Sequence, residues 1–97
     1  MKINLNLIMK IKLELFGASR DFSEKDHLKV EVKDKASIKD LRDEIIQYLD
    51  KNFKGNESFI KIVKSSAFCS ENNEIISDNY KITKNQKIGI IPPIGGG

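Results

Sequence analysis

The sequence lacks several features that common functional classes require. One cysteine and one histidine among 97 residues exclude an intramolecular disulfide and a zinc framework built from Cys and His ligands. There is no tryptophan, and 17 Lys and Arg residues are scattered among 14 Asp and Glu residues, so the clustered basic stripe that binds nucleic acid is missing. No apolar run approaches the ~20 residues of a membrane span, and no signal-peptide pattern opens the chain. These absences predict one compact domain in the reducing cytoplasm.

The chain opens with alternating apolar residues, which occupy the odd positions Ile3, Leu5, Leu7, Met9, Ile11, Leu13 and Leu15. This period of two predicts a strand with one buried side. It is long for a strand, whose usual length is about five or six residues. Residues 1–8 therefore either extend the first strand as an N-terminal extension or form an added segment, and the domain proper spans residues 9–91.

A connecting loop is expected over residues 17–25, which hold Gly, Ser and Asp with Phe22 as the main apolar anchor. Apolar and charged residues then alternate over 28–33, which predicts a second half-buried strand that pairs antiparallel with the first. His27 stands just before this strand. We interpret it as a solvated turn residue and not as a catalytic group.

A helix is predicted to start at Ser37, because Asp40 follows three residues later and the pair resembles a capping box. Apolar residues then recur at helical spacing, which places one stripe in the core: Ile38, Leu41, Ile45, Tyr48 and Leu49. Gly55 is the expected helix stop.

The second half of the chain carries shorter signals. Residues 59–63 read as a short strand, and residues 67–69 read as another strand that leads through a turn at 71–73 into Ile75 and Ile76. Cys69 is interpreted as a small buried residue, since no nearby group would activate its thiol. After polar turn residues, positions 87–91 form a last strand that is apolar on both faces, as a central strand would be, with Gly89 allowing close backbone approach.

The order strand, strand, helix, strands, with a buried last strand, is that of the β-grasp or ubiquitin-like fold. The predicted class is α+β, with a mixed sheet of about five strands and one main helix packed across one face. In this fold the first and last strands lie side by side and parallel, so the sheet would hold the end of the chain rigidly.

The chain ends in two prolines, one apolar residue and three glycines: Pro92, Pro93, Ile94, Gly95, Gly96 and Gly97. Proline cannot donate to a sheet, so the last strand must stop at Pro92. Residues 92–97 then form a Pro-Pro stalk and a flexible Gly-Gly-Gly tail. The four residues after the prolines carry the terminal carboxylate about 14 Å outward. A tail without side chains can enter a narrow channel in another protein.

The ending from Ile90 to Gly97 resembles that of the small subunit of molybdopterin synthase, a sulfur-carrier family with the ubiquitin-like β-grasp fold. Residues 15–20, Leu-Phe-Gly-Ala-Ser-Arg, are similar to that family's exit from its first strand, and residues 72–82 are similar to its late hairpin. The resemblance extends from about Met9 to Gly97. The chain departs from the family at residues 85–87, Asn-Gln-Lys, where a Gly-Asp-acidic turn is usual.

The resemblance implies a sulfur-carrier function in molybdenum or tungsten cofactor biosynthesis. An adenylyltransferase related to ubiquitin-activating enzymes would join the Gly97 carboxylate to AMP from ATP, and a persulfide donor would then supply sulfur to form a C-terminal thiocarboxylate. The tail would enter the large subunit of molybdopterin synthase and deliver sulfur to a pterin precursor. The chain would bind no cofactor, would not be catalytic alone, and would contribute Gly97 as the reacting group and residues 92–96 as the partner-binding tail.

Two other functions are compatible with the same ending. A ubiquitin-like protein modifier would be joined through Gly97 to lysines of other proteins. A carrier for thiazole or another thiolated metabolite would use the same thiocarboxylate, although such chains tend to be shorter and to lack the Pro-Pro step. An ordinary β-grasp interaction domain is the simplest alternative.

Overall fold

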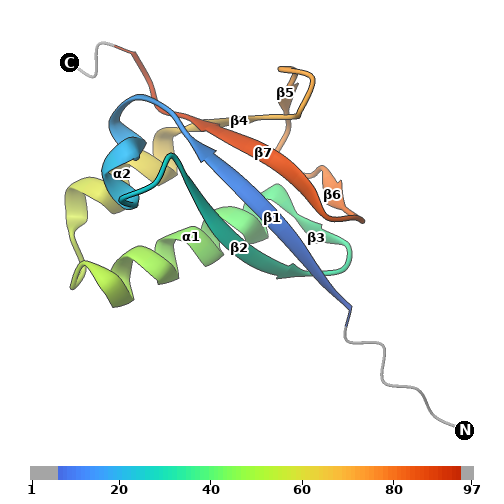
Figure 1. Ribbon diagram of the computed structural model, residues 1–97, viewed down its shortest axis with the longest axis horizontal. Helices are drawn as coiled ribbons and strands as arrows, with labels where there is room; N and C mark the ends of the chain where they lie inside the picture. The colour runs from blue at the N-terminus through green and yellow to red at the C-terminus, as the bar shows by residue number, and fades with distance from the viewer. Residues whose placement is uncertain (1–6, 95–97) are drawn as a thin grey trace, which may run out of the picture.

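The computed structural model describes residues 7–94, so the tail glycines and most of the predicted extension over residues 1–8 lie outside it. Its elements follow one another along the chain (Figure 1) in this order: β1 (Ile8–Leu15), a 3-10 helix η1 (Gly17–Phe22), β2 (His27–Lys33), β3 (Ala36–Ser37), α1 (Ile38–Asn52), α2 (Glu57–Ser65), β4 (Ala67–Cys69), β5 (Ile75–Ile76), β6 (Lys81–Ile82) and β7 (Gln86–Ile91).

The main sheet has five strands in the order β2-β1-β7-β4-β5. Strand β1 pairs antiparallel with β2 and parallel with β7, and β4 pairs antiparallel with both β7 and β5. Strands β3 and β6 form a separate antiparallel pair. The predicted mixed sheet is therefore confirmed, and so is the central place of the last strand beside the first.

The core lies between one face of the sheet and the helices (Figure 1). Alternation places odd-numbered β1 residues and even-numbered β2 and β7 residues on this inner face, where the helices cover them. The largest fully buried side chains come from β1, η1, α1, β4, β6 and β7: Ile11, Leu13, Leu15, Phe22, Ile38, Leu41, Ile45, Leu49, Phe68, Ile82, Ile88 and Ile90. Each buried side chain of this size contributes roughly 1.5–3 kcal/mol of transfer free energy. The core is thus what orients β7 and the segment that follows it.

Helix α1 starts as predicted. The Ser37 hydroxyl accepts a hydrogen bond from the Asp40 backbone N–H at 3.1 Å, and Asp40 accepts one from the Ser37 backbone N–H at 2.9 Å. The backbone N–H of Ser37 is the main reason that the pKa of Asp40 lies below its usual 3.8. This contact therefore stabilises the fold above that pH and is lost as the pH falls through the lowered pKa. Gly55, the predicted stop, follows the helix with a φ of 71°.

The strand predicted over residues 59–63 is wrong, because the segment lies in helix α2. Short apolar runs fit both periods, and here Phe59, Ile62 and Val63 share one helix face toward the core. The Asn56 side chain accepts a hydrogen bond from the Phe59 backbone N–H at 3.1 Å and caps the helix. Helix α1 is the main helix predicted across the sheet, and α2 is a second, shorter helix that packs on α1 and η1.

The loop predicted over residues 17–25 is also partly wrong, because its first six residues form η1. The turn is closed by Ser19, whose hydroxyl donates to the Phe16 carbonyl at 2.7 Å and whose backbone N–H donates to the same oxygen at 3.1 Å. Phe22 is fully buried, as its predicted anchor role requires. His27 begins β2 and does not lie in a turn, and its Nδ1 is 2.9 Å from Asp26.

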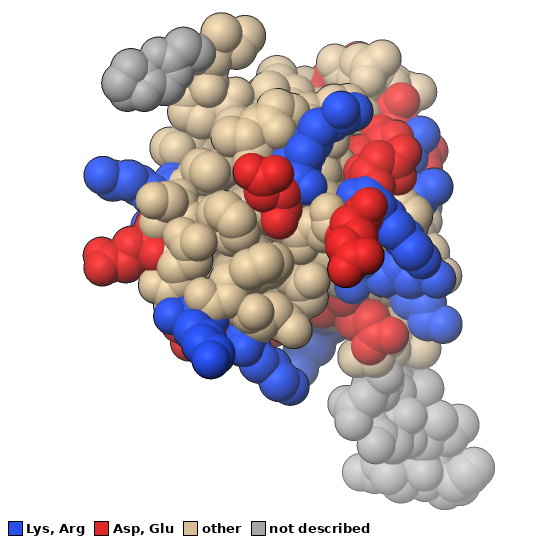
Figure 2. Space-filling view, turned by 60° about the vertical axis from the view of Figure 1, so that its left-hand side comes forward, with Lys and Arg blue, Asp and Glu red and all other residues tan. Residues whose placement is uncertain are grey.

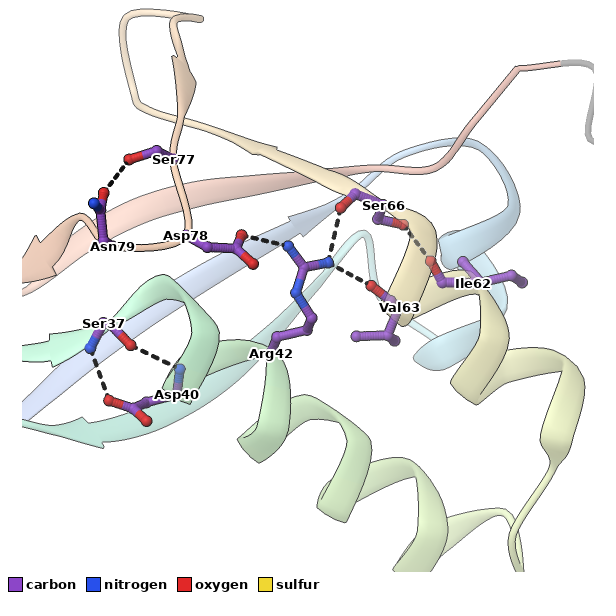
Figure 3. Close-up of polar contacts among 9 residues, drawn as sticks. All are labelled: Ser37, Asp40, Arg42, Ile62, Val63, Ser66, Ser77, Asp78 and Asn79. Carbon is purple, nitrogen blue, oxygen red and sulfur yellow. Dashed lines mark hydrogen bonds and ion pairs between the residues drawn. The ribbon is translucent and has the colours of Figure 1, made fainter.

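Arg42 of α1 joins four elements of the fold (Figure 3). Its guanidinium donates to the Val63 carbonyl at 2.7 Å and to the Ser66 carbonyl at 2.8 Å, and it pairs with Asp78 at 2.6 Å. Its guanidinium carbon also lies 4.9 Å from the centre of the Phe68 ring. The side chain is 14% exposed. The Arg42 guanidinium therefore donates hydrogen bonds to two backbone carbonyls at the C-terminal end of α2. Through the same group, α2 is linked to the start of β4 and to the turn before β6.

Candidate functional site

The candidate site is the exit of the chain from β7. Ile91, the last β7 residue, pairs with Ala67 of β4, and Pro92 directly after it is buried. A Cβ built on Gly17 would lie 3.9 Å from Cδ of Pro92, so the turn after β1 lies against this proline. Gly17 has a φ of 56°, which favours glycine. The first proline of the stalk is thus held by the folded domain.

Beyond Pro92 the chain leaves the domain. Pro93 is exposed, and Ile94 is 98% exposed. Both termini of the described chain point away from the sheet at opposite ends of the molecule (Figure 1). The predicted tail residues Gly95, Gly96 and Gly97 lie outside the described residues, so their assignment as site residues stays a prediction. The structure therefore gives the stalk a buried base at Pro92, followed by exposed residues at Pro93 and Ile94.

An apolar surface borders the stalk on the open face of the sheet, which is the face opposite the helices. The register places its members side by side, since Ala67 pairs with Ile91 and Cys69 pairs with both Gly89 and Ile75. We call this the apolar rim and define it as Phe16, Ala67, Ile75 and Ile91. Phe16 is 42% exposed and Ile75 is 67% exposed. Phe16, Ala67 and Ile91 lie nearest the stalk, and Ile75 lies on β5, which β4 separates from β7. A contiguous patch of exposed apolar side chains is a candidate surface for protein contact.

Farther from the stalk, the same face is charged. Lys12 lies beside Lys29 of β2 on one side and Lys87 of β7 on the other. The Lys87 ammonium is 3.7 Å from the Glu14 carboxylate. On the side of the molecule shown in Figure 2, acidic and basic side chains are interspersed, while the surface next to the stalk is uncharged. The site thus combines an apolar part near the stalk with a charged part of both signs.

Position 89 requires glycine because two side chains pack over it, whereas the sequence predicted a close approach of backbone. A Cβ built on it would lie 2.8 Å from the Cys69 sulfur and 2.9 Å from Cε2 of Phe16. The residue thus admits two side chains, where the sequence suggested close approach of backbone. Cys69 is buried, as predicted.

We expect Gly89→Ala to lower the free energy of unfolding by about 1–3 kcal/mol, because the added methyl group displaces Phe16 and Cys69. Urea unfolding monitored by circular dichroism measures the change. In the Cys69→Ala background the same substitution should cost less, since one of the two clashes is gone. Equal costs in both backgrounds would show that the Cys69 contact does not constrain position 89.

The apolar rim was not identified from the sequence. Three of its residues come from β4, β5 and β7, and Phe16 comes from the turn after β1. Each alone reads as an ordinary strand or turn residue. The one available signal was the alternation within β7, which places Gly89 and Ile91 opposite the core residues Ile88 and Ile90. Only the strand order brings Ala67 and Ile75 beside them.

Within residues 7–94, no helix is both long enough and apolar enough to cross a membrane. The same range holds no group of three or more His, Cys, Asp or Glu side chains arranged to bind a metal ion.

The sequence profile described as the ThiS family matches residues 13–97. A search among curated proteins found no match. Among solved structures, a chain described as a candidate molybdopterin converting factor, subunit 1, from Pyrococcus furiosus superposes with a TM-score of 0.65 at 22% identity, covering 89% of this chain and 99% of that one.

Two further structures are similar to this chain. Small archaeal modifier protein 1 of Haloferax volcanii has a TM-score of 0.63 at 15% identity, covering 89% of this chain and 99% of its own. The ubiquitin of Caldiarchaeum subterraneum has a TM-score of 0.58 at 16% identity, covering 93% and 99%. These likenesses confirm the ubiquitin-like β-grasp fold.

Proposed function

The chain belongs to the ThiS family, and from this premise we propose that it is the sulfur-carrier small subunit of a molybdopterin synthase. It would deliver sulfur, as a thiocarboxylate on Gly97, to a pterin precursor in molybdenum or tungsten cofactor biosynthesis. One observation carries the proposal. The last strand is clamped between β1 and β4, its first following proline is buried, and the next two residues are exposed. The folded domain thus holds the base of the segment that leads to Gly97.

Formation of the thiocarboxylate requires activation by partners. An α-carboxyl group with a pKa of about 3.5 is ionised at neutral pH and resists substitution. In our proposal its oxygen attacks the α-phosphorus of ATP within an adenylyltransferase, and pyrophosphate leaves. The terminal sulfur of a persulfide donor then attacks the acyl carbon, and AMP leaves to give an acyl disulfide. A second thiol of the donor attacks the donor's own sulfur in this bond, which releases the thiocarboxylate and leaves a disulfide on the donor. This chain supplies the reacting terminus and its reach, while the partners supply the acids, bases and phosphate-binding groups.

The apolar rim is the proposed contact surface for the large subunit and for the activating enzyme. It lies beside the stalk, so a partner that admits the tail must also approach this surface. Aromatic and aliphatic side chains that lose water at such a contact supply most of the binding energy. Phe16 and Ile75 are the rim residues with the most apolar area to lose.

A protein modifier joined through Gly97 to lysines, and a carrier for another thiolated metabolite, are the alternatives. The modifier of Haloferax volcanii has the same fold at 15% identity, which supports the alternative by architecture alone. Chemistry at Gly97 distinguishes these functions, since a modifier forms an amide bond to a target protein. The two kinds of sulfur carrier both form a thiocarboxylate. They differ in the molecule that accepts the sulfur, which is a pterin precursor for one and another metabolite for the other.

Intact-mass measurement tests the proposal. The protein is incubated with its adenylyltransferase, ATP and a persulfide donor, and the expected product is heavier by the difference between one sulfur and one oxygen atom. The large subunit and pterin precursor are then added, and the mass should return to its starting value as dithiolene product forms. A product joined by an amide bond to other proteins, with no thiocarboxylate, would favour the modifier.

We expect Cys69→Ala to retain the full rate of sulfur transfer, because the thiol is buried and the reacting sulfur is on Gly97 in our proposal. Turnover of the precursor with purified partners measures the rate, and circular dichroism confirms the fold. Loss of transfer by a folded variant would assign the sulfur chemistry to the thiol and contradict the role of Gly97.

A further inference from the structure

The outer edge of β2 pairs with no other strand in the described part of the chain, because β2 ends the five-stranded sheet. The backbone N–H of Leu15 donates to the Asp26 carbonyl, and that of Asp34 donates to the Leu7 carbonyl, both at 3.0 Å. Bonded pairs alternate along an antiparallel ladder, so even-numbered β2 residues bond to β1. The odd-numbered residues therefore direct their N–H and C=O groups to the free edge: His27, Lys29, Glu31 and Lys33.

The two faces of this edge carry different side chains. On the inner face, Leu28, Val30 and Val32 line a hollow that β2 forms with Glu44 and Tyr48 of α1. On the open face, Lys29, Glu31 and Lys33 alternate with them and are exposed. An exposed edge of this length is a template for pairing with another strand.

Lys29 has an unfavourable neighbour within its own sheet. It lies directly across from Lys12, and like charges in this position are destabilising. Among the ion pairs of the described residues, none involves Lys29. A carboxylate on the outer side of β2 would compensate this charge.

We propose that two copies of this chain associate through their β2 strands, which pair antiparallel about a two-fold axis at Val30. In this register Lys29 of each copy lies opposite Glu31 of the second copy. Val30 meets Val30, and Leu28 meets Val32, so the inner face stays apolar across the junction. The contact is isologous and closes on itself, and it joins the two sheets into one.

Charge selects this register among the symmetric ones. The free-edge groups belong to odd-numbered residues of β2, which spans His27–Lys33. A symmetric ladder that makes these residues face one another and pairs more than three residues of each strand must centre on Lys29, Val30 or Glu31. An axis at Lys29 would place two lysines directly opposite each other. An axis at Glu31 would oppose two glutamates and would also place Lys29 opposite Lys33. Among these three axes, only the one at Val30 places a lysine opposite a glutamate.

The association leaves the stalk free and does not depend on the proposed sulfur-carrier function. In the sheet, β1 lies between β2 and β7. Pairing of two β2 strands therefore does not cover the apolar rim, which lies on the other side of β1. Two antiparallel copies would present their tails at opposite ends of the joined sheet. A dimer could thus offer both tails to partners.

A charge exchange tests the proposal by analytical ultracentrifugation over a range of concentrations. For the 97-residue chain we expect the mass to rise with concentration from 11.0 kDa toward twice that value. Lys29→Glu alone and Glu31→Lys alone each oppose like charges twice across the axis, and each should weaken association by about tenfold or more. The double variant restores opposite charges and should regain association. Lys29→Glu also removes the clash with Lys12, so thermal unfolding should show a fold at least as stable.

A crosslink tests the register itself. In the Cys69→Ala background, Val30→Cys places two thiols in a non-bonded antiparallel pair, where Cα atoms are about 4.5 Å apart, within the range of a disulfide. Lys33→Cys is the control on the same edge, since it lies opposite His27 of the second copy. We expect a covalent dimer for Val30→Cys and none for Lys33→Cys. A monomer at every concentration, or equal crosslinking at both positions, would overturn the proposal.

Discussion

Deletion of Gly97 is expected to abolish sulfur transfer while leaving the fold and its unfolding transition unchanged. The residue lies beyond the stalk, whose buried base at Pro92 stays in place. Each residue spans about 3.5 Å, and a misplacement of 1 Å at a reacting centre can cost on the order of a hundredfold in rate. Product formation by the purified carrier, activating enzyme, large subunit and precursor measures the loss.

The matched variant carries one additional glycine after Gly97, which moves the carboxylate by the same distance in the opposite direction. Both variants can be supplied as preformed thiocarboxylates made by chemical ligation, which bypasses activation. Inactivity in this form places the length requirement in the synthase, and recovered activity places it in the activating enzyme. Normal turnover by the unligated deletion variant would remove Gly97 from its assigned role.

The substitution Arg42→Met is expected to lower the free energy of unfolding by about 2–4 kcal/mol. The substitution keeps the aliphatic stem but removes the donors to the Val63 and Ser66 carbonyls and the partner of Asp78. Hydrogen bonds to a charged group each contribute roughly 1.5–3 kcal/mol, and those losses overlap within one side chain. The Arg42 side chain is mostly buried, so water replaces these contacts poorly.

Urea unfolding of Arg42→Met and of Lys39→Met distinguishes this network from a general effect of removing a cation from α1. Lys39 is exposed on the same helix, and its substitution should change stability by less than about 0.5 kcal/mol. Equal stability of the two variants would show that the contacts of Arg42 contribute nothing to the fold. The transfer activity of Arg42→Met at low temperature should be normal, because none of the groups that Arg42 contacts belongs to β7 or to the stalk.

Several local features follow from the sequence because their physics is local. The cap formed by Ser37 and Asp40 needs only residues three apart, and the alternation of β1 and β2 needs only a period of two. Pro92 ends β7 whatever surrounds it, since proline cannot donate to a ladder. These signals were sufficient for the β-grasp order and for the position of the stalk.

Helix α2 shows where local signals failed. The run of Phe59, Ile60, Ile62 and Val63 satisfies a strand and a helix face equally well, and nothing within it discriminates. The surface against which the segment packs decides that it is a helix. One face of α2 packs against α1 and against Phe22 of η1, and the centres of the Phe22 and Phe59 rings are 5.1 Å apart. Burial against these surfaces outweighs the β propensity of the segment.

The sequence by itself determined the ending of this protein: a strand that must stop at Pro92, followed by a chain without bulky side chains after Ile94. Only the tertiary structure decided what surrounds that ending. It buried Pro92 beside Gly17 and brought Phe16 and Cys69 over Gly89. It also assembled the apolar rim from three strands and the turn after β1, and left β2 at the edge of the sheet. The physical reason is that strand order and register are set by long-range pairing and by burial of one common core, and neither is encoded in any single stretch.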